Sequence, residues 1–302
     1  MKISTVAPAK INWTLEVLGR RPDGYHEVRT VFQTVSLCDR VRVSAAEGLE
    51  LVLRGPAGQG TNSLAGLPPS ENLAYRAAVL LRETAGERIL GARVELEKAI
   101  PAGTGLGGGS SDAAATLRAL DRLWGLGLPP GELARVGAQL GADVPFFLFG
   151  GTALGCGRGD EVTPLGDVPA QPLLLVVPKR RTAGKTAAMY AGLRSEHFSG
   201  GEASERLAAV IERGAAPGDN DVRNTFENIA AEVLPEAADA AEHCRRLGLR
   251  PHLAGSGPAQ FALLKADGEP APLRKALVAA GLDVFEVATM AAEGATALVE
   301  EP

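Results

Sequence analysis

The run of residues that decides the fold begins at Pro101, ends at Asp112 and reads PAGTGLGGGSSD. The segment before it, 91–98, alternates apolar and polar residues, which predicts a strand. The alanine-rich segment after it predicts a helix from Ser110 to about Trp124. The glycine run is therefore predicted to connect a strand to the first turn of a helix.

Such a connection is suited to binding phosphate groups. Five of its residues are glycines, so few side chains keep a ligand from the backbone. Its amides and the first amides of the helix can form a nest for an anion. Ser110 and Ser111 add hydroxyls that can contact a phosphate or its Mg²⁺. The predicted polyphosphate site comprises Pro101, Ala102, Gly103, Thr104, Gly105, Leu106, Gly107, Gly108, Gly109, Ser110 and Ser111.

Other interpretations of the glycine motifs are less well supported. The run satisfies G-x-G-x-x-G, but a dinucleotide site also needs an acidic residue at the end of a second strand about 20 residues later. The sequence there, 126–130, is LGLPP and ends no strand. GKT at 184–186 lacks the earlier glycine of a P-loop, because position 179 is lysine. A merely flexible connection would not need this strand–loop–helix setting.

The overall composition indicates a globular protein of 302 residues, long enough for two domains. A net charge of −5 argues against a nucleic-acid partner. The three cysteines are far apart in sequence, which favours a reducing compartment. No window holds about 18 consecutive apolar residues and the first residues lack a signal-peptide core, so a cytoplasmic protein without a membrane partner is expected.

The pattern of elements predicts the α+β class, with a domain boundary near 163–170. The first part is expected to hold strands at 11–18, 27–37, 40–46, 49–54 and 91–98, and helices at 72–81, 110–124 and 130–140. The second part is expected to hold a strand at 172–178, helices at 184–194, 203–213, 225–247 and 270–280, a hairpin at 250–254 and 259–265, and a closing strand at 283–289. We expect its helices to lie on one face of its sheet.

Asp143 and Lys10 are the candidate reactive groups. Asp143 lies in GADVPFF, where a carboxylate among small and apolar residues is costly unless it is paired. It is either a satisfied aspartate at a helix end, or a general base or orienting group for a substrate hydroxyl. An early lysine such as Lys10 is usually solvated. If it lies near Asp143, it would keep that carboxylate ionised and polarise the attacking oxygen.

A turn at 20–27, RRPDGYHE, presents an aromatic ring beside an imidazole. Tyr25 and His26 could stack on and hydrogen-bond to a heterocycle, or Tyr25 could simply pack on the sheet. The other histidines show no metal-ligand spacing, so no metal site formed by the protein is predicted.

Several motifs together resemble one family. PAKIN at 8–12, PAGTGLGGGSSDAAA at 101–115 and AGSGP at 254–258 resemble the three motifs of the GHMP (galactokinase, homoserine, mevalonate, phosphomevalonate) kinases. Within that superfamily, PDGYHEV at 22–28 and GADVPFF at 141–147 resemble the branch that acts on a cytidine-diphosphate-linked methylerythritol in non-mevalonate isoprenoid synthesis. The resemblance runs from residue 8 to about 290.

This resemblance implies a fold and an activity. The N-terminal domain, 1–165, would be similar to ribosomal protein S5 domain 2, and the C-terminal domain, 166–302, would be ferredoxin-like, with ligands in the cleft between them. The activity would be ATP-dependent phosphorylation of the 2-hydroxyl of the methylerythritol moiety, with Mg-ATP as donor and ADP as product.

The resemblance also implies roles for single residues. Lys10 and Asp143 would be the catalytic pair, and 101–111 would hold the ATP phosphates. The remaining positions would be Asn72 and Lys98 near the adenine, Asn12 near the reacting groups, and Tyr25, His26 and Tyr190 at the cytosine. Asp160 stands where the family more often has glutamate.

Two alternatives remain at this point. One is another GHMP kinase, acting on homoserine or a mevalonate-like substrate; such substrates have no base for Tyr25 and His26 to bind. The other is a nucleotide-binding protein without transfer activity, which would be expected if Lys10 or Asp143 were missing.

Overall fold

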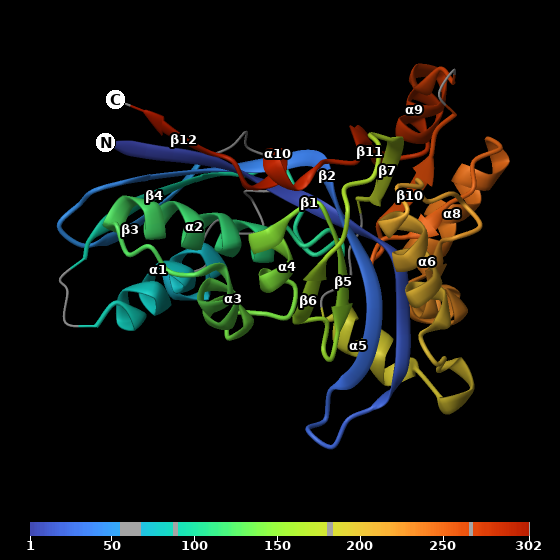
Figure 1. Ribbon diagram of the computed structural model, residues 1–302. Coiled ribbons are helices and arrows are strands. Elements are labelled where there is room, and N and C mark those ends of the chain that lie inside the picture. Colours follow the sequence, from blue (N-terminus) through green and yellow to red (C-terminus); the bar gives the residue numbers. More distant parts are fainter. Residues whose placement is uncertain (55–67, 87–89, 180–183, 266–267, 302) are drawn as a thin grey trace.

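The computed structural model describes residues 1–54, 68–86, 90–179, 184–265 and 268–301. Within these ranges the chain forms two β-sheets, one of eight strands and one of four, with helices packed on them (Figure 1). The prediction of the α+β class is confirmed.

Two long antiparallel strands form the centre of the first sheet. β1 (Lys2–Arg20) pairs with β2 (His26–Ser44) over nearly its whole length, and the pair extends well below the rest of the sheet in Figure 1. The sequence predicted shorter strands here. The register shifts at three places along β1, and such bulges bend a ribbon without ending it, so the predicted breaks are bends within continuous strands.

The first sheet runs in the order β12-β1-β2-β4-β3, and three short strands attach at its side. β5 pairs with β2 and β6, and β8 pairs in parallel with β1. The strand bounds are β3 (Leu49–Arg54), β4 (Ala92–Glu97), β5 (Thr152–Cys156), β6 (Glu161–Pro164), β8 (Arg223–Asn224) and β12 (Leu298–Glu301).

The helices of the first half lie together beneath this sheet (Figure 1). They are the 3-10 helix η1 (Pro69–Glu71), α1 (Leu73–Thr84), α2 (Gly108–Trp124), α3 (Pro130–Ala138) and α4 (Val144–Phe149). α2 contacts both β1 and β2, and its alanines at 113–115 and 119 are fully buried. Because these side chains are small, the helix can lie close to the sheet, with its first turn beside β1.

The second sheet has the order β11-β7-β10-β9, and all its strands are antiparallel. Its strands are β7 (Pro172–Pro178), β9 (His252–Leu253), β10 (Gln260–Leu263) and β11 (Leu282–Ala288). The helices of this half are α5 (Lys185–Gly192), η2 (Ser195–His197), α6 (Glu202–Glu212), η3 (Thr225–Asn228), α7 (Ala230–Val233), α8 (Pro235–Arg246), α9 (Pro270–Ala279) and α10 (Ala292–Thr296). The predicted helix 225–247 was wrong as one element, because the chain breaks before Pro235, which begins α8.

β7 joins the two halves because both of its faces are buried. Leu173, Leu175 and Val177 pack into a core that includes residues of β1 and β2. Leu174 and Val176 face the other way and pack against residues of α8 and α9. α8 and α9 cover one face of the second sheet, whereas Leu207 and Ile211 of α6 pack on the opposite face together with the first half. The expectation that the helices of this half all lie on one face was therefore wrong.

The end of the chain returns to the first sheet. The sequence predicted that the strand near 283–289 closes the chain, which was wrong, since α10 and β12 follow it. β12 pairs antiparallel with β1, with Glu301 opposite Lys2, so the two ends of the chain lie side by side in Figure 1. The division into domains at 165/166 stays a prediction. In the described part of the chain, no helix combines the length and the apolar character that crossing a membrane would require.

Candidate active site

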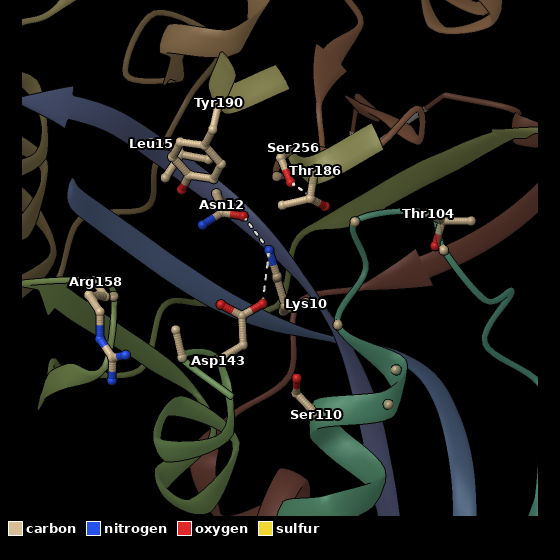
Figure 2. A pocket seen from close by; sticks show the side chains of 18 of the residues that line it. Lys10, Asn12, Leu15, Thr104, Ser110, Asp143, Arg158, Thr186, Tyr190 and Ser256 are labelled. Carbon is tan, nitrogen blue, oxygen red and sulfur yellow. Dashed lines mark hydrogen bonds and ion pairs between the residues drawn. The ribbon is translucent and has the colours of Figure 1, made fainter. Parts of the chain in front are cut away.

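A cavity of about 1170 Å³ is lined by residues from both halves of the chain. Glycine-loop residues lie on one side of it, and Asp143 and Arg158 lie on the other, with Lys10 between them (Figure 2). Ser256 and α5 residues, including Thr186 and Tyr190, complete the wall from the second half.

The glycine loop approaches the second half so closely that a side chain would not fit. Gly105 has a φ of +88°, and a Cβ atom there would lie 2.4 Å from the carbonyl oxygen of Ala254. The backbone amide of Ala259 also donates to the carbonyl of Thr104 at 3.2 Å. The loop after β4 is therefore packed backbone to backbone against the AGSGP turn.

The loop is equally close to Lys10. Gly107 has a φ of +74°, and a Cβ atom there would lie 2.7 Å from the Phe147 ring and 3.1 Å from the Lys10 side chain. The Lys10 amide donates to the carbonyl of Leu106 at 2.9 Å. Gly107 is the N-cap of α2, which begins two residues earlier than Ser110, because a left-handed glycine can turn the chain into the helix.

Most of the predicted phosphate-binding segment lines the cavity. Two members do not: Leu106 is fully buried and Ser111 is only 1% exposed, and neither is part of the cavity wall. The wall is formed by Pro101, Ala102, Gly103, Thr104, Gly105, Gly107, Gly108, Gly109 and Ser110. Figure 2 shows the Ser110 hydroxyl pointing toward Lys10 and Asp143 from the first turn of α2.

Lys10 and Asp143 lie together, as the sequence analysis required. The Lys10 ammonium is 3.7 Å from Asp143 Oδ2 and donates to Asn12 Oδ1 at 2.7 Å (Figure 2). Asn12 in turn donates to the Thr30 hydroxyl at 2.7 Å, so its amide is held in one orientation. Lys10 is buried on β1, whereas the Asp143 side chain is 34% exposed and open to the cavity.

Asp143 owes its position to a helix that the sequence analysis missed. One interpretation of GADVPFF was the end of a helix, but Asp143 precedes a new helix, α4, with Pro145 in its first turn. Phe146 and Phe147 of α4 are buried, and the Phe146 ring stacks on Phe32 of β2 at 4.7 Å. The apolar residues after Asp143 therefore anchor the helix that carries the carboxylate.

Of the residues proposed to bind the base, Tyr25 is exposed, whereas His26 and Tyr190 pack on each other. Tyr25 is 57% exposed and lines the cavity. The His26 ring packs on Tyr190 of α5 with ring centroids 4.9 Å apart. Burial, and then the charge of Arg20, lowers the pKa of His26, so its ring is neutral near pH 7. Burial raises the pKa of Tyr190, and the nearby Asp143 charge adds to this effect.

Lys98 and Asn72 also line the cavity, and each has a structural partner. Asn72 caps α1 by accepting from the Ala74 amide at 2.9 Å. Lys98 is paired with Asp39 and lies 2.6 Å from Asp112 Oδ2, and all three side chains are buried. Burial raises the pKa of Asp112 well above its usual range, although the Lys98 charge opposes this shift.

Some residues of the cavity wall had no predicted role. Arg20 lies opposite His26 on the neighbouring strand, and Arg158 lies over the ring of Tyr25. The hydroxyls of Thr186 and Ser256 are 3.3 Å apart in the part of the wall that the second half forms. A signal existed for Ser256, because it lies within the AGSGP motif. Arg158 lies in the same turn as Asp160, but no role was predicted for it, because its position depends on how the turn after β5 folds back to the cavity.

Known proteins are similar to this chain in sequence and in fold. Residues 72–151 match the protein family described as "GHMP kinases N terminal domain". A 4-diphosphocytidyl-2-C-methyl-D-erythritol kinase from Geobacillus thermodenitrificans is 41% identical over 88% of this chain and 90% of its own length. One from Dehalococcoides mccartyi is 39% identical over 95% of this chain and 98% of its own length. A crystal structure of a 4-(cytidine 5'-diphospho)-2C-methyl-D-erythritol kinase, 37% identical, superposes with a TM-score of 0.76 and covers 95% of this chain and 98% of that one.

Proposed function

Because this chain belongs to the 4-diphosphocytidyl-2-C-methyl-D-erythritol kinase family of the GHMP kinases, we propose that Lys10 and Asp143 are the catalytic pair of that reaction. The enzyme uses ATP to phosphorylate the 2-hydroxyl of 4-diphosphocytidyl-2-C-methyl-D-erythritol, and it releases the 2-phosphate and ADP. This step belongs to the non-mevalonate route to isoprenoid precursors. The observation that carries the assignment of the pair is their 3.7 Å contact opposite the glycine loop, within one cavity.

The acceptor hydroxyl lies between Asp143 and the glycine loop. Asp143 accepts its proton, or orients it, while the oxygen forms a bond to the γ-phosphorus of ATP. The bond from that phosphorus to the β–γ bridging oxygen breaks, and ADP leaves with the negative charge. The amides of 101–111 and the first turn of α2 hold the phosphates in line and offset their charge.

Lys10 and Asn12 act beside this proton transfer. The Lys10 ammonium, fixed by its 2.7 Å bond to Asn12, attracts the negative charge that grows on the attacking oxygen. Asn12 is held by Thr30, so the ammonium is oriented before substrate binds. Such preorganisation is what phosphoryl transfer chiefly requires from a protein.

ATP enters this scheme as Mg-ATP. Mg²⁺ usually binds through substrate phosphates and one or two protein oxygens rather than in an all-protein cage, so we place it on the phosphates of the nucleotide. Ser110, whose hydroxyl points into the cavity, would hold it from the protein side. The ion, when bound, neutralises phosphate charge. Asn72 and Lys98 lie near the adenine end of the nucleotide.

The cytidine end of the substrate binds at the aromatic side of the cavity. Tyr25, exposed on the wall, stacks on the cytosine, and the neutral His26 ring hydrogen-bonds to it. Tyr190, packed on His26, limits the space on the other side. We place the enzyme in the cytoplasm, without a nucleic-acid or membrane partner; its three cysteines carry free thiols, which suits a reducing compartment.

A coupled assay of ADP release tests the substrate assignment. The purified protein is given Mg-ATP with 4-diphosphocytidyl-2-C-methyl-D-erythritol, homoserine or mevalonate at equal concentrations. We expect turnover with the first substrate and background rates with the other two, because only the first carries a base. Comparable turnover with homoserine or mevalonate would favour the other GHMP activity.

A further inference from the structure

One arginine of the cavity wall has no role in the reaction described above. Arg158 lies in the turn between β5 and β6, and it shares the wall with Tyr25 and Arg20. Figure 2 shows it on the side of Asp143 that faces away from the glycine loop. It is thus separated from the phosphate nest and close to the residues assigned to the cytidine.

The guanidinium of Arg158 is held in place by its own turn. Its Nε donates to Asp160 Oδ2 at 3.0 Å, and a terminal nitrogen donates to the same oxygen. The Arg158 backbone amide donates to the other carboxylate oxygen of Asp160 at 3.2 Å. Because Asp160 is bound at both the backbone and the side chain of Arg158, the guanidinium has little freedom to swing into solvent.

This fixed cation lies over the ring of Tyr25. The guanidinium carbon of Arg158 is 5.0 Å from the centre of the ring, within the range of a cation–π contact. The backbone of Tyr25 is set by its turn, since its amide donates to Asp23 at 3.0 Å and its carbonyl accepts from Arg21 at 2.8 Å. Arg158 covers one side of the ring, while the Tyr25 residue as a whole is 57% exposed and lines the cavity, so much of it stays accessible to a ligand.

We propose that Arg158 is a positioning residue for substrate binding, which holds one face of Tyr25 so that the opposite face stacks on the pyrimidine. This inference rests on the proposed function, in which Tyr25 binds the cytosine. A ring that is already ordered loses less conformational entropy when the base arrives, and affinity rises accordingly. Arg158 therefore acts on KM for the cytidine-bearing substrate through Tyr25, and it contributes nothing to phosphoryl transfer.

Steady-state kinetics of single variants give the first test. We expect Arg158→Gln to raise KM for the cytidine-bearing substrate about three- to tenfold, the range of one cation–π contact, with kcat and KM for ATP unchanged. Arg158→Lys should restore part of the loss, because an ammonium can also lie over the ring. A KM for Arg158→Gln equal to that of the parent overturns the proposal.

A double-mutant cycle separates positioning from direct contact with the substrate's diphosphate. If Arg158 acts through Tyr25, the Arg158→Gln/Tyr25→Ala variant has the same KM as Tyr25→Ala alone. If the two effects multiply, Arg158 contacts the substrate itself and the positioning role is wrong. Calorimetric titration with cytidine diphosphate should give the same ratios, and this readout does not depend on turnover.

The same cycle shows which assignment has failed. If Tyr25→Ala leaves KM unchanged, the cytosine assignment fails and the inference fails with it. If Tyr25→Ala raises KM and Arg158→Gln does not, only the inference fails. Arg122→Gln is the matched control, because Arg122 is an exposed arginine paired with Glu300 at 2.8 Å and is absent from the cavity wall. Equal melting temperatures of Arg158→Gln and the parent confirm that the fold is retained.

Discussion

At the scale of single residues, the carboxylate of Asp143 is the most sensitive position in the proposed mechanism. Replacing it with asparagine keeps the side-chain shape but removes the proton acceptor. We expect Asp143→Asn to lower kcat by about 10²- to 10⁴-fold, the usual contribution of a general base. ATP affinity, measured by calorimetry, should stay nearly constant, because the phosphate nest lies on the opposite side of the cavity. Activity within tenfold of the parent would remove Asp143 from this role.

His26 predicts how substrate binding depends on pH. Its pKa is lowered from 6.5 by burial and by the charge of Arg20, so the neutral ring persists below pH 6.5. KM for the cytidine-bearing substrate should therefore rise, as the ring becomes protonated, at a lower pH than it would for an ordinary histidine. An NMR titration of the His26 ring, with His26→Gln to assign its signal, gives the pKa directly. A midpoint at or above 6.5 would contradict this prediction.

The same shift has a defined sign for stability. The unfolded chain binds the His26 proton at a higher pH than the folded chain does. The neutral His26 ring therefore stabilises the folded chain above pH 6.5, and the free energy of unfolding decreases as the pH falls below that value.

The identities of the candidate residues could be predicted from the sequence, but their partners could not. Lys10, Asp143 and the glycine run stand in recognisable local motifs. Asp39 stands in no such motif, and Asp112 stands in the glycine motif, but nothing in that motif indicates that it pairs with Lys98 in the interior. Their contact joins β2 to α2 across many intervening residues, so only the folded chain brings it about.

At the scale of elements, the glycine loop is the segment least tolerant of a side chain. Gly107→Ala would force an alanine into a left-handed conformation and place its Cβ 2.7 Å from the Phe147 ring. We expect a loss of about 2–4 kcal/mol in the free energy of unfolding, from backbone strain together with overpacking. ATP affinity should fall as well, because Phe147 and Lys10 must shift.

Urea unfolding and ATP titration check this prediction, and a second glycine provides the control. Gly131 lies in the first turn of α3, with no atom within 4 Å of a Cβ added there. Gly131→Ala should leave ATP binding unchanged and stabilise the protein by about 0.5 kcal/mol or less. If Gly107→Ala proves as harmless as Gly131→Ala, the close packing of the loop has no energetic importance.

Elements with a clear local sequence pattern could be predicted, and elements that form only through contacts with other segments could not. The segment 172–178 is continuously apolar, and it forms β7, buried on both faces. α4 is too short for a helical period to be recognised, and it depends on Phe146 and Phe147 fitting a pocket of the first half. The short strand β8 has two residues, and it exists only because β1 lies beside it.

At the scale of the whole molecule, the contacts that join the two halves cannot be predicted from the order of the elements along the chain. The segment after β11 looks like a simple end of the second half, yet β12 pairs with β1 at the start of the chain. The pairing of these strands joins residues almost 300 positions apart, and no local signal can encode it. The cavity likewise depends on contacts between distant segments, since its wall takes residues from both halves.

Asn224 of β8 is a buried side chain that connects the AGSGP turn of the second half to the first sheet. It is 3% exposed, and its amide donates to the carbonyls of Leu253 at 2.9 Å and Gly255 at 2.8 Å. Its oxygen accepts from the Phe226 amide at 3.0 Å. It thus holds the AGSGP turn, which closes on the glycine loop, to the long strand that carries Lys10.

Asn224→Ala leaves these three buried backbone groups without their partner. We expect it to lower the free energy of unfolding by about 2–4 kcal/mol, since an unsatisfied buried polar group costs about 1–3 kcal/mol and water will reach some of them. KM for ATP should rise too, because the turn facing the glycine loop loses its support. Asn220→Ala is the control: Asn220 is exposed and its side chain accepts from Arg250 at 2.8 Å, so its removal should cost about 0.5 kcal/mol or less. Equal urea midpoints for the two variants would mean that the turn is held by backbone packing alone, and that the joint between the halves does not depend on Asn224.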